Sequence, residues 1–107
     1  MAFDPLPKLE NADIEKTFEP MFAHIDQNDH VNSTAYLTWA IETMPKETLQ
    51  TKQLTEIEIA YKNETLYGQH VTAKTQLIDC NDELTAIHLI TNNETNTEAA
   101  RLKTKWQ

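Results

Sequence analysis

Side chains that can donate, accept or transfer protons are concentrated between residues 24 and 32 of the 107-residue chain. The stretch reads His24-Ile25-Asp26-Gln27-Asn28-Asp29-His30-Val31-Asn32. If the chain is extended there, side chains two residues apart point to the same side. The groups that then share one surface are a carboxylate, two amides and an imidazole, at Asp26, Asn28, His30 and Asn32.

A helix is predicted directly after this stretch, over residues 33–44. Asn32 or Ser33 can cap its start, and Pro45 disfavours helical geometry at the residue before it. Free N–H groups and the positive dipole end at a helix start can polarise a thioester carbonyl and stabilise developing negative charge. The combination suggests acyl transfer to water. The apolar residues at helical spacing are Tyr36, Leu37, Ala40, Ile41 and Met44.

A purely structural interpretation of the same residues stays open. Asp26 and Asn28 can shape a polar turn, while Asn32 caps the helix. A metal site is not expected, because the four histidines, at positions 24, 30, 70 and 88, lack a recognisable ligand spacing. The single cysteine, Cys80, is expected to be an inert thiol beside a turn.

The elements that would position this stretch are strands. Residues 54–61 alternate between Ile57, Ile59 and Tyr61 on one face and Glu56, Glu58 and Ala60 on the other. Short polar turns separate the later strands, which predicts an α+β domain with a largely antiparallel sheet against one helix. One helix covers only part of such a sheet, so an edge or face is expected to pair with another unit. The predicted strands are residues 17–25, 54–61, 69–78, 83–91 and 97–106.

Length and composition limit the possible functions. A chain of 107 residues suits one domain, and residues 1–16, with Pro5 and Pro7, are predicted to be a leader before a domain at 17–107. The net charge of −8 argues against a nucleic-acid partner. No apolar run approaches the roughly 20 residues that span a bilayer. The N-terminal residues also lack the pattern of a signal peptide, so a cytoplasmic protein without a membrane partner is expected.

Three ordered motifs resemble those of the acyl-acyl-carrier-protein (acyl-ACP) thioesterase family. Residues 26–36, followed by Trp39 and Glu42, resemble its D-x-N-x-H-V-N-N-x-x-Y signature at the start of the central helix. Residues 57–65, Ile-Glu-Ile-Ala-Tyr-Lys-Asn-Glu-Thr, resemble its L-x-x-x-Y-R-R-E-C strand. Residues 101–106 resemble its R-x-x-T-x-W ending. The motifs span most of residues 18–106.

The resemblance implies a hotdog fold, in which an antiparallel sheet of about five strands wraps around one central helix. It also implies hydrolysis of acyl-ACP thioesters to free fatty acids without a metal or organic cofactor. Glu64 or Asp26 would orient and deprotonate a water, while His30 and helix-start N–H groups stabilise the oxyanion and assist thiolate departure. Asn28 would fix the water or the carbonyl. The residues that it implies are Asp26, Asn28, His30 and Glu64 for catalysis, and Asn32 and Tyr36 for substrate binding.

One departure from the family pattern concerns the residue after Glu64. Plant-like members commonly have Cys there, whereas this chain has Thr65, so a cysteine nucleophile is disfavoured. Asn32 is also favoured as a helix cap over a substrate ligand.

A second departure is length, because the family usually has two fused hotdog repeats and the chain resembles the C-terminal one. The leader then resembles a linker between repeats. An excised C-terminal domain is favoured over a compact relative that forms a homodimer. The implied partner is an acidic acyl carrier protein, which would need a local basic patch. Candidates for that patch are Lys62, Lys74, Arg101, Lys103 and Lys105.

Two other functions stay open. One is a non-catalytic hotdog module that supports dimerisation or binds acyl groups, although such a module would not need acids, an amide and an imidazole at one point. The other is a coenzyme A (CoA) thioesterase or a hotdog dehydratase. Assays of thiol release from carrier-protein and CoA substrates would separate these activities.

Overall fold

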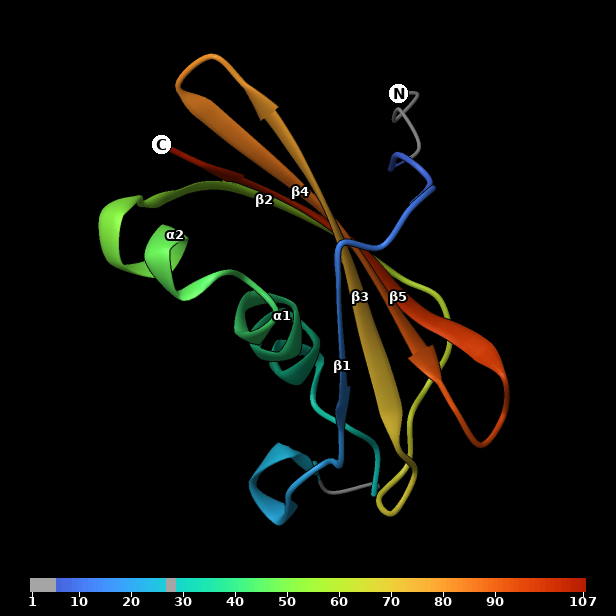
Figure 1. The fold of residues 1–107 in the computed structure, drawn as a ribbon. Coiled ribbons are helices and arrows are strands. Elements are labelled where there is room, and N and C mark those ends of the chain that lie inside the picture. The colour runs from blue at the N-terminus through green and yellow to red at the C-terminus, as the bar shows by residue number, and fades with distance from the viewer. Residues whose placement is uncertain (1–5, 27–28) are drawn as a thin grey trace, which may run out of the picture.

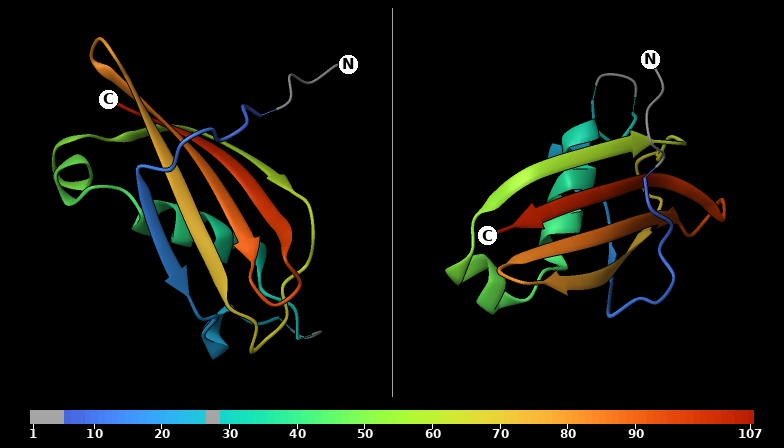
Figure 2. Two further views of the ribbon diagram at one scale, coloured as in Figure 1. Left: turned by 45° about the vertical axis from the view of Figure 1, so that its right-hand side comes forward. Right: turned by 90° about the horizontal axis from the view of Figure 1, so that it is seen from above.

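The computed structural model describes residues 6–26 and 29–107. Five strands form one antiparallel sheet in the order β1-β3-β4-β5-β2, and the sheet curves around helix α1 (Figures 1 and 2). The α+β hotdog arrangement expected from the sequence is therefore confirmed. The elements are β1 (Ile14–Phe18), the short 3₁₀ helix η1 (Phe22–His24), α1 (Ser33–Glu42), α2 (Lys46–Thr51), β2 (Leu54–Tyr61), β3 (Val71–Cys80), β4 (Glu83–Asn92) and β5 (Thr97–Trp106).

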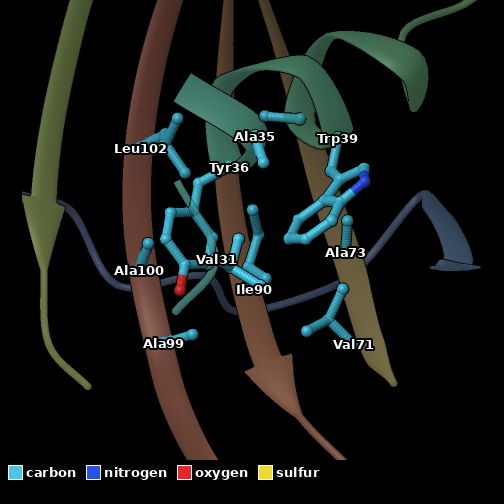
Figure 3. Packing of buried hydrophobic residues seen from close by; sticks show 11 residues of the cluster. Val31, Ala35, Tyr36, Trp39, Val71, Ala73, Ile90, Ala99, Ala100 and Leu102 are labelled. Atoms are coloured by element: carbon cyan, nitrogen blue, oxygen red, sulfur yellow. The ribbon is translucent and has the colours of Figure 1, made fainter. Parts of the chain in front are cut away.

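The core lies between α1 and the concave face of the sheet (Figure 3). Tyr36 and Trp39 from α1 are buried against side chains of the three central strands, including Ile90 and Leu102. Small side chains in both layers, such as Ala40 and Ala73, are fully buried and let the helix lie close to the sheet. This packing fixes the position of the helix start, where the polar stretch of the sequence ends.

Two of the predicted strands match the structure at both ends, β2 and β5. The hairpins that join β3 to β4 and β4 to β5 each turn at an asparagine with positive φ, 59° at Asn81 and 57° at Asn96. Asparagine adopts this backbone region more readily than most residues. The polar stretches predicted as turns therefore have the residues that tight turns need.

The first strand, predicted over residues 17–25 near an edge or with an interruption, does lie at the sheet edge, but its predicted bounds were wrong. β1 spans Ile14–Phe18, because buried Pro20 cannot donate a ladder hydrogen bond and the chain then turns into η1. Helix α1 ends at Glu42, two residues before the predicted end, and the Thr43 hydroxyl donates to Ala40 O at 2.6 Å. Helix α2 was not predicted, since its six residues are too few for an apolar repeat.

Residues 6–13 lie against the convex face of the sheet. The Glu10 N–H donates to Gln76 Oε1 at 2.9 Å, and the Asp13 carboxylate accepts the Leu77 N–H at 2.8 Å. Leu9 lines a small hollow with Leu89 on this face. The segment predicted as a leader therefore covers apolar surface that α1 cannot reach. No helix in the described part of the chain is long and apolar enough to cross a membrane.

A polar network is buried where the end of α1 meets the sheet. His88 is only 1% exposed, and its Nδ1 and Nε2 atoms bond to the hydroxyls of Thr75 at 2.7 Å and Thr104 at 2.8 Å. The Thr75 hydroxyl also bonds to that of Thr43. Burial lowers the pKa of His88 to about 4, because the charged imidazolium would lose its hydration.

The buried histidine predicts a loss of stability in acid. The unfolded chain binds a proton at His88 near pH 6.5, whereas the folded chain binds it only near pH 4. His88 should therefore cost the fold up to about 3 kcal/mol as the pH falls from 6.5 through 4. Urea unfolding of the chain and of His88→Gln at several pH values measures this. The fall in unfolding free energy should be smaller in the variant, and equal falls would contradict the assignment.

Candidate active site

The described residues of the polar stretch, 24–26 and 29–32, pair with each other and do not continue as the single extended segment that the spacing predicted. The Asp26 N–H donates to His30 O at 2.9 Å, and the His30 N–H donates to Asp26 Oδ1 at 3.2 Å. Ile25 and Val31 form an antiparallel bridge across the turn, and Asp29 has a φ of 60°. Asp26 and His30 therefore face each other across a turn. Asn28, predicted as the third catalytic residue, lies outside the described residues.

The loop after β2 runs antiparallel to this turn and is fixed to it by backbone contacts. The Val31 N–H donates to Thr65 O at 2.8 Å, and the Tyr67 N–H donates to Asp29 O at 3.2 Å. His30 and Leu66 form a bridge between these contacts. The two segments are distant in sequence, so the pairing sets which side chains meet.

This pairing brings His30 and Glu64 together. His30 Nδ1 lies 3.4 Å from Glu64 Oε1, and the two side chains are 34% and 71% exposed. A solvent-accessible imidazole beside a carboxylate can exchange protons with a bound substrate and with water. Glu64, which only the family resemblance singled out, thus reaches the polar stretch from another element.

The start of α1 lies beside the pair. Asn32 Oδ1 accepts the N–H of Thr34 at 2.9 Å, so the predicted helix cap is confirmed. The Asn32 N–H donates to His24 O at 2.6 Å. The Ser33 N–H, by contrast, has no acceptor within the described ranges, 6–26 and 29–107. One backbone donor of the helix start therefore remains available to a ligand.

These groups line an open pocket of about 380 Å³. The catalytic candidates occupy one part of it, and the rings of Tyr36 and Tyr61, with centroids 5.9 Å apart, occupy another. The pocket thus combines a polar centre with an apolar wall. Its lining residues are Asp26, His30, Val31, Ser33, Tyr36, Tyr61, Lys62, Asn63 and Glu64.

Tyr36, predicted as a substrate-binding residue, reaches the pocket from the buried face of α1. Burial raises the pKa of its hydroxyl, and the nearby carboxylate of Glu64 raises it further. The Tyr36 hydroxyl therefore keeps its proton and can act as a donor. The neighbouring Thr65, which is fully buried, acts to lower the pKa of Tyr36. The Thr65 Oγ1 atom nevertheless makes no hydrogen bond of normal geometry with a described residue.

Five lining residues were not predicted from the sequence to be active-site residues: Val31, Ser33, Tyr61, Lys62 and Asn63. The alternation over residues 54–61 placed Tyr61 on the same face as Ile57 and Ile59, and its ring does lie next to that of Tyr36 in α1. The residues after it lead directly to Glu64. A β-strand that ends at the pocket was therefore the available signal for three of the five, Tyr61, Lys62 and Asn63.

The other histidines have structural contacts. The His24 ring packs edge-on against Trp39 with centroids 5.5 Å apart, and its Nδ1 accepts the Met21 N–H at 3.0 Å. His70 pairs with Glu94 at 3.1 Å, on the surface. Within the described ranges, no group of three or more His, Cys, Asp or Glu side chains is placed to hold a metal ion.

The proposed basic patch is largely neutralised. Lys103 lies 3.7 Å from a carboxylate oxygen of Glu58, and Lys105 lies 3.5 Å from one of Glu56. Lys74 and Arg101 likewise pair with glutamates. These four paired side chains therefore contribute little net positive charge to the surface. Lys62, the fifth candidate, lines the pocket instead.

Comparison with known proteins identifies the family. The model of the acyl-ACP thioesterase C-terminal domain matches residues 8–107. The chain belongs to the acyl-ACP thioesterase family. The chloroplastic oleoyl-acyl carrier protein thioesterase of Coriandrum sativum is 30% identical over 110 residues, which cover 82% of this chain and 30% of that protein.

Solved structures support the same fold. The 12:0-ACP thioesterase from Umbellularia californica superposes with a TM-score of 0.88 at 24% identity, over 98% of this chain and 40% of that chain. An acyl-ACP thioesterase from Bacteroides thetaiotaomicron superposes with a TM-score of 0.73 at 22% identity, over 100% of this chain and 44% of that chain. The chain thus spans less than half the length of these relatives.

Proposed function

We propose that the chain is the catalytic hotdog unit of an enzyme that hydrolyses acyl-ACP thioesters to free fatty acids. The observation that carries the proposal is the contact of His30 with Glu64, 3.4 Å apart in a pocket at the start of α1. Family membership supports it. A non-catalytic acyl-binding module would not require these two side chains to meet.

The geometry suggests a division of labour between the two acids. The Asp26 carboxylate accepts the His30 N–H and so stabilises the turn, whereas Glu64 is 71% exposed at the pocket. Glu64 is therefore the better candidate to deprotonate a water, whose oxygen attacks the thioester carbonyl carbon. Asn28 is retained, from the family resemblance, as the residue that fixes the water or the carbonyl.

The oxyanion would be stabilised at the other side of the pocket. As the carbonyl oxygen gains negative charge, it can accept a hydrogen bond from the Ser33 N–H. The positive end of the α1 dipole stabilises the same negative charge. Collapse of the intermediate breaks the carbon–sulfur bond, and the departing thiolate takes a proton from the His30–Glu64 pair. Tyr36 and Tyr61 would contact the acyl chain. Asn32 caps helix α1, and its exposed surface would contact the substrate.

The edge strand β2 is the proposed site of pairing with a second hotdog unit. Within the described sheet β2 pairs only with β5, which leaves its other side without a ladder partner. Ile57 and Tyr61 on this strand are 41% and 53% exposed. An exposed edge with apolar side chains favours strand addition, and Tyr61 would then line a pocket at the junction.

Two expectations from the sequence remain proposals. Residues 1–16 are proposed to derive from a linker between two hotdog repeats, in keeping with the greater length of the relatives. A cytoplasmic location also stays a prediction, since the Coriandrum relative is described as chloroplastic.

The hydrolase proposal predicts the effect of removing either partner of the pair. His30→Ala and Glu64→Gln should each lower kcat/KM for acyl-ACP by a factor of about 10² to 10⁴, because each removes a proton-transfer group. Thiol release from ACP and CoA thioesters measures this, on the chain and on any longer protein that contains it. The surface pair His70 and Glu94 offers matched controls, His70→Ala and Glu94→Gln. Equal activity of all four variants would refute the catalytic assignment.

The pairing proposal predicts an effect of charge on the edge strand. Ile57→Lys should shift a self-associated chain toward monomer in sedimentation velocity, because a buried lysine at the junction would lose its hydration. Ile78→Lys is the matched control, since Ile78 is also 41% exposed but lies on β3. A parent that stays monomeric at every concentration, or equal effects of both variants, would argue against self-pairing through β2.

A further inference from the structure

The Tyr36 side chain extends from the core toward the loop that carries Glu64. Tyr36 is only 4% exposed, yet it lines the pocket together with Glu64. Its hydroxyl points away from α1, toward the end of the core that holds Val31 and Ala99 (Figure 3). Both of those residues bind the loop after β2 through their backbones.

The loop is fixed to the rest of the fold on both sides of Glu64. The Asn63 N–H donates to Ala99 O at 3.3 Å. On the other side of Glu64, Thr65 O accepts the Val31 N–H at 2.8 Å. Neither bond involves the peptide that joins Glu64 to Thr65, whose polar groups are the Glu64 carbonyl and the Thr65 N–H.

The two donors of Thr65 are buried and need an acceptor. Thr65 is 0% exposed, so neither its N–H nor its hydroxyl can bond to bulk water. Within residues 6–26 and 29–107, no backbone carbonyl accepts the N–H, and the hydroxyl makes no hydrogen bond of normal geometry. A buried donor without an acceptor destabilises a fold, so such groups almost always have a partner.

The Tyr36 hydroxyl interacts with both of these donors. Burial raises the pKa of this hydroxyl, and the hydroxyl and backbone of Thr65 oppose the rise as hydrogen-bond donors. The Glu64 carboxylate raises the same pKa further, so it too lies near the phenol. One buried oxygen is therefore close to both donors of Thr65 and to the carboxylate of the preceding residue.

We propose that Tyr36 is a positioning residue, whose phenol oxygen holds the Glu64–Thr65 peptide and so fixes the direction of the Glu64 carboxylate. The inference rests on the proposed function, in which Glu64 deprotonates a water. Glu64 is 71% exposed, so packing of its own side chain does little to orient it. Tyr36 is itself held by Trp39, whose ring lies edge-on at 5.6 Å, and so gives the loop a fixed point of attachment.

Tyr36→Phe separates positioning from binding, because it keeps the ring that would contact the acyl chain and removes only the hydroxyl. In thiol release from acyl-ACP, kcat should fall about ten- to a hundredfold, the effect of a misplaced catalytic group. KM should change by less than about twofold, since uniform binding is kept. Tyr67→Phe is the matched control and should change neither constant, because the Tyr67 ring packs on Phe22 at the surface.

The Glu64→Gln background shows whether Tyr36 acts through Glu64. A glutamine cannot deprotonate water, so Tyr36→Phe should slow the Glu64→Gln enzyme by less than about threefold. Thr65→Val removes one donor of the same contact and decides the matter if Tyr36→Phe does not fold. It should lower kcat in the parent and have little effect in the Glu64→Gln background. An unchanged kcat in the parent, or a loss of the same factor in both backgrounds, would overturn the inference.

Hydrogen exchange tests the contact without turnover and so separates this inference from the proposed function. In Tyr36→Phe the Thr65 amide should exchange about tenfold faster than in the parent, as the loss of one hydrogen bond predicts. Tyr67→Phe should leave its exchange unchanged. Unchanged exchange at Thr65 in Tyr36→Phe would overturn the inference even if His30 and Glu64 prove catalytic. Failure of the hydrolase proposal would instead appear as thiol release that does not depend on His30 and Glu64.

Discussion

The backbone pairing between residues 29–31 and residues 65–67 is the constraint on which the site depends. Two hydrogen bonds and one bridge fix the turn before α1 to the loop after β2. Neither segment belongs to a long strand, so few other contacts would hold them in register. Because the carbonyl of Thr65, the residue after Glu64, accepts the Val31 N–H, the Glu64 carboxylate lies beside the His30 imidazole.

The packing of α1 makes that pairing possible. Tyr36 and Trp39 anchor the helix in the concave face of the sheet, and Asn32 closes its first turn. The helix start therefore presents its free N–H beside the imidazole and the carboxylate. One pocket therefore contains both a hydrogen-bond donor for an oxyanion and a proton-transfer pair. Acyl transfer requires both groups near the reacting carbonyl.

The sequence predicted the regular elements better than the connections between them. Alternation placed β2 and helical spacing placed α1, because those patterns follow from burial of one face. The polar stretch before residue 97 marked the start of β5. The pairing of Asp26 with His30 was missed, since it depends on local hydrogen bonds and on a positive φ at Asp29. Residues 6–13 were assigned to a leader because contacts with a convex sheet face leave no periodic pattern. Glu64 could be placed at the site only through the family motif, as no spacing relates it to His30.

The central claim is that His30 and Glu64 act as one unit. A double-mutant cycle on kcat/KM for acyl-ACP, with His30→Ala, Glu64→Gln and the double variant, measures their coupling directly. If the two side chains share one proton-transfer task, the double variant should be about as slow as the slower single variant. Losses that multiply would show that the two groups act independently, and would contradict the account.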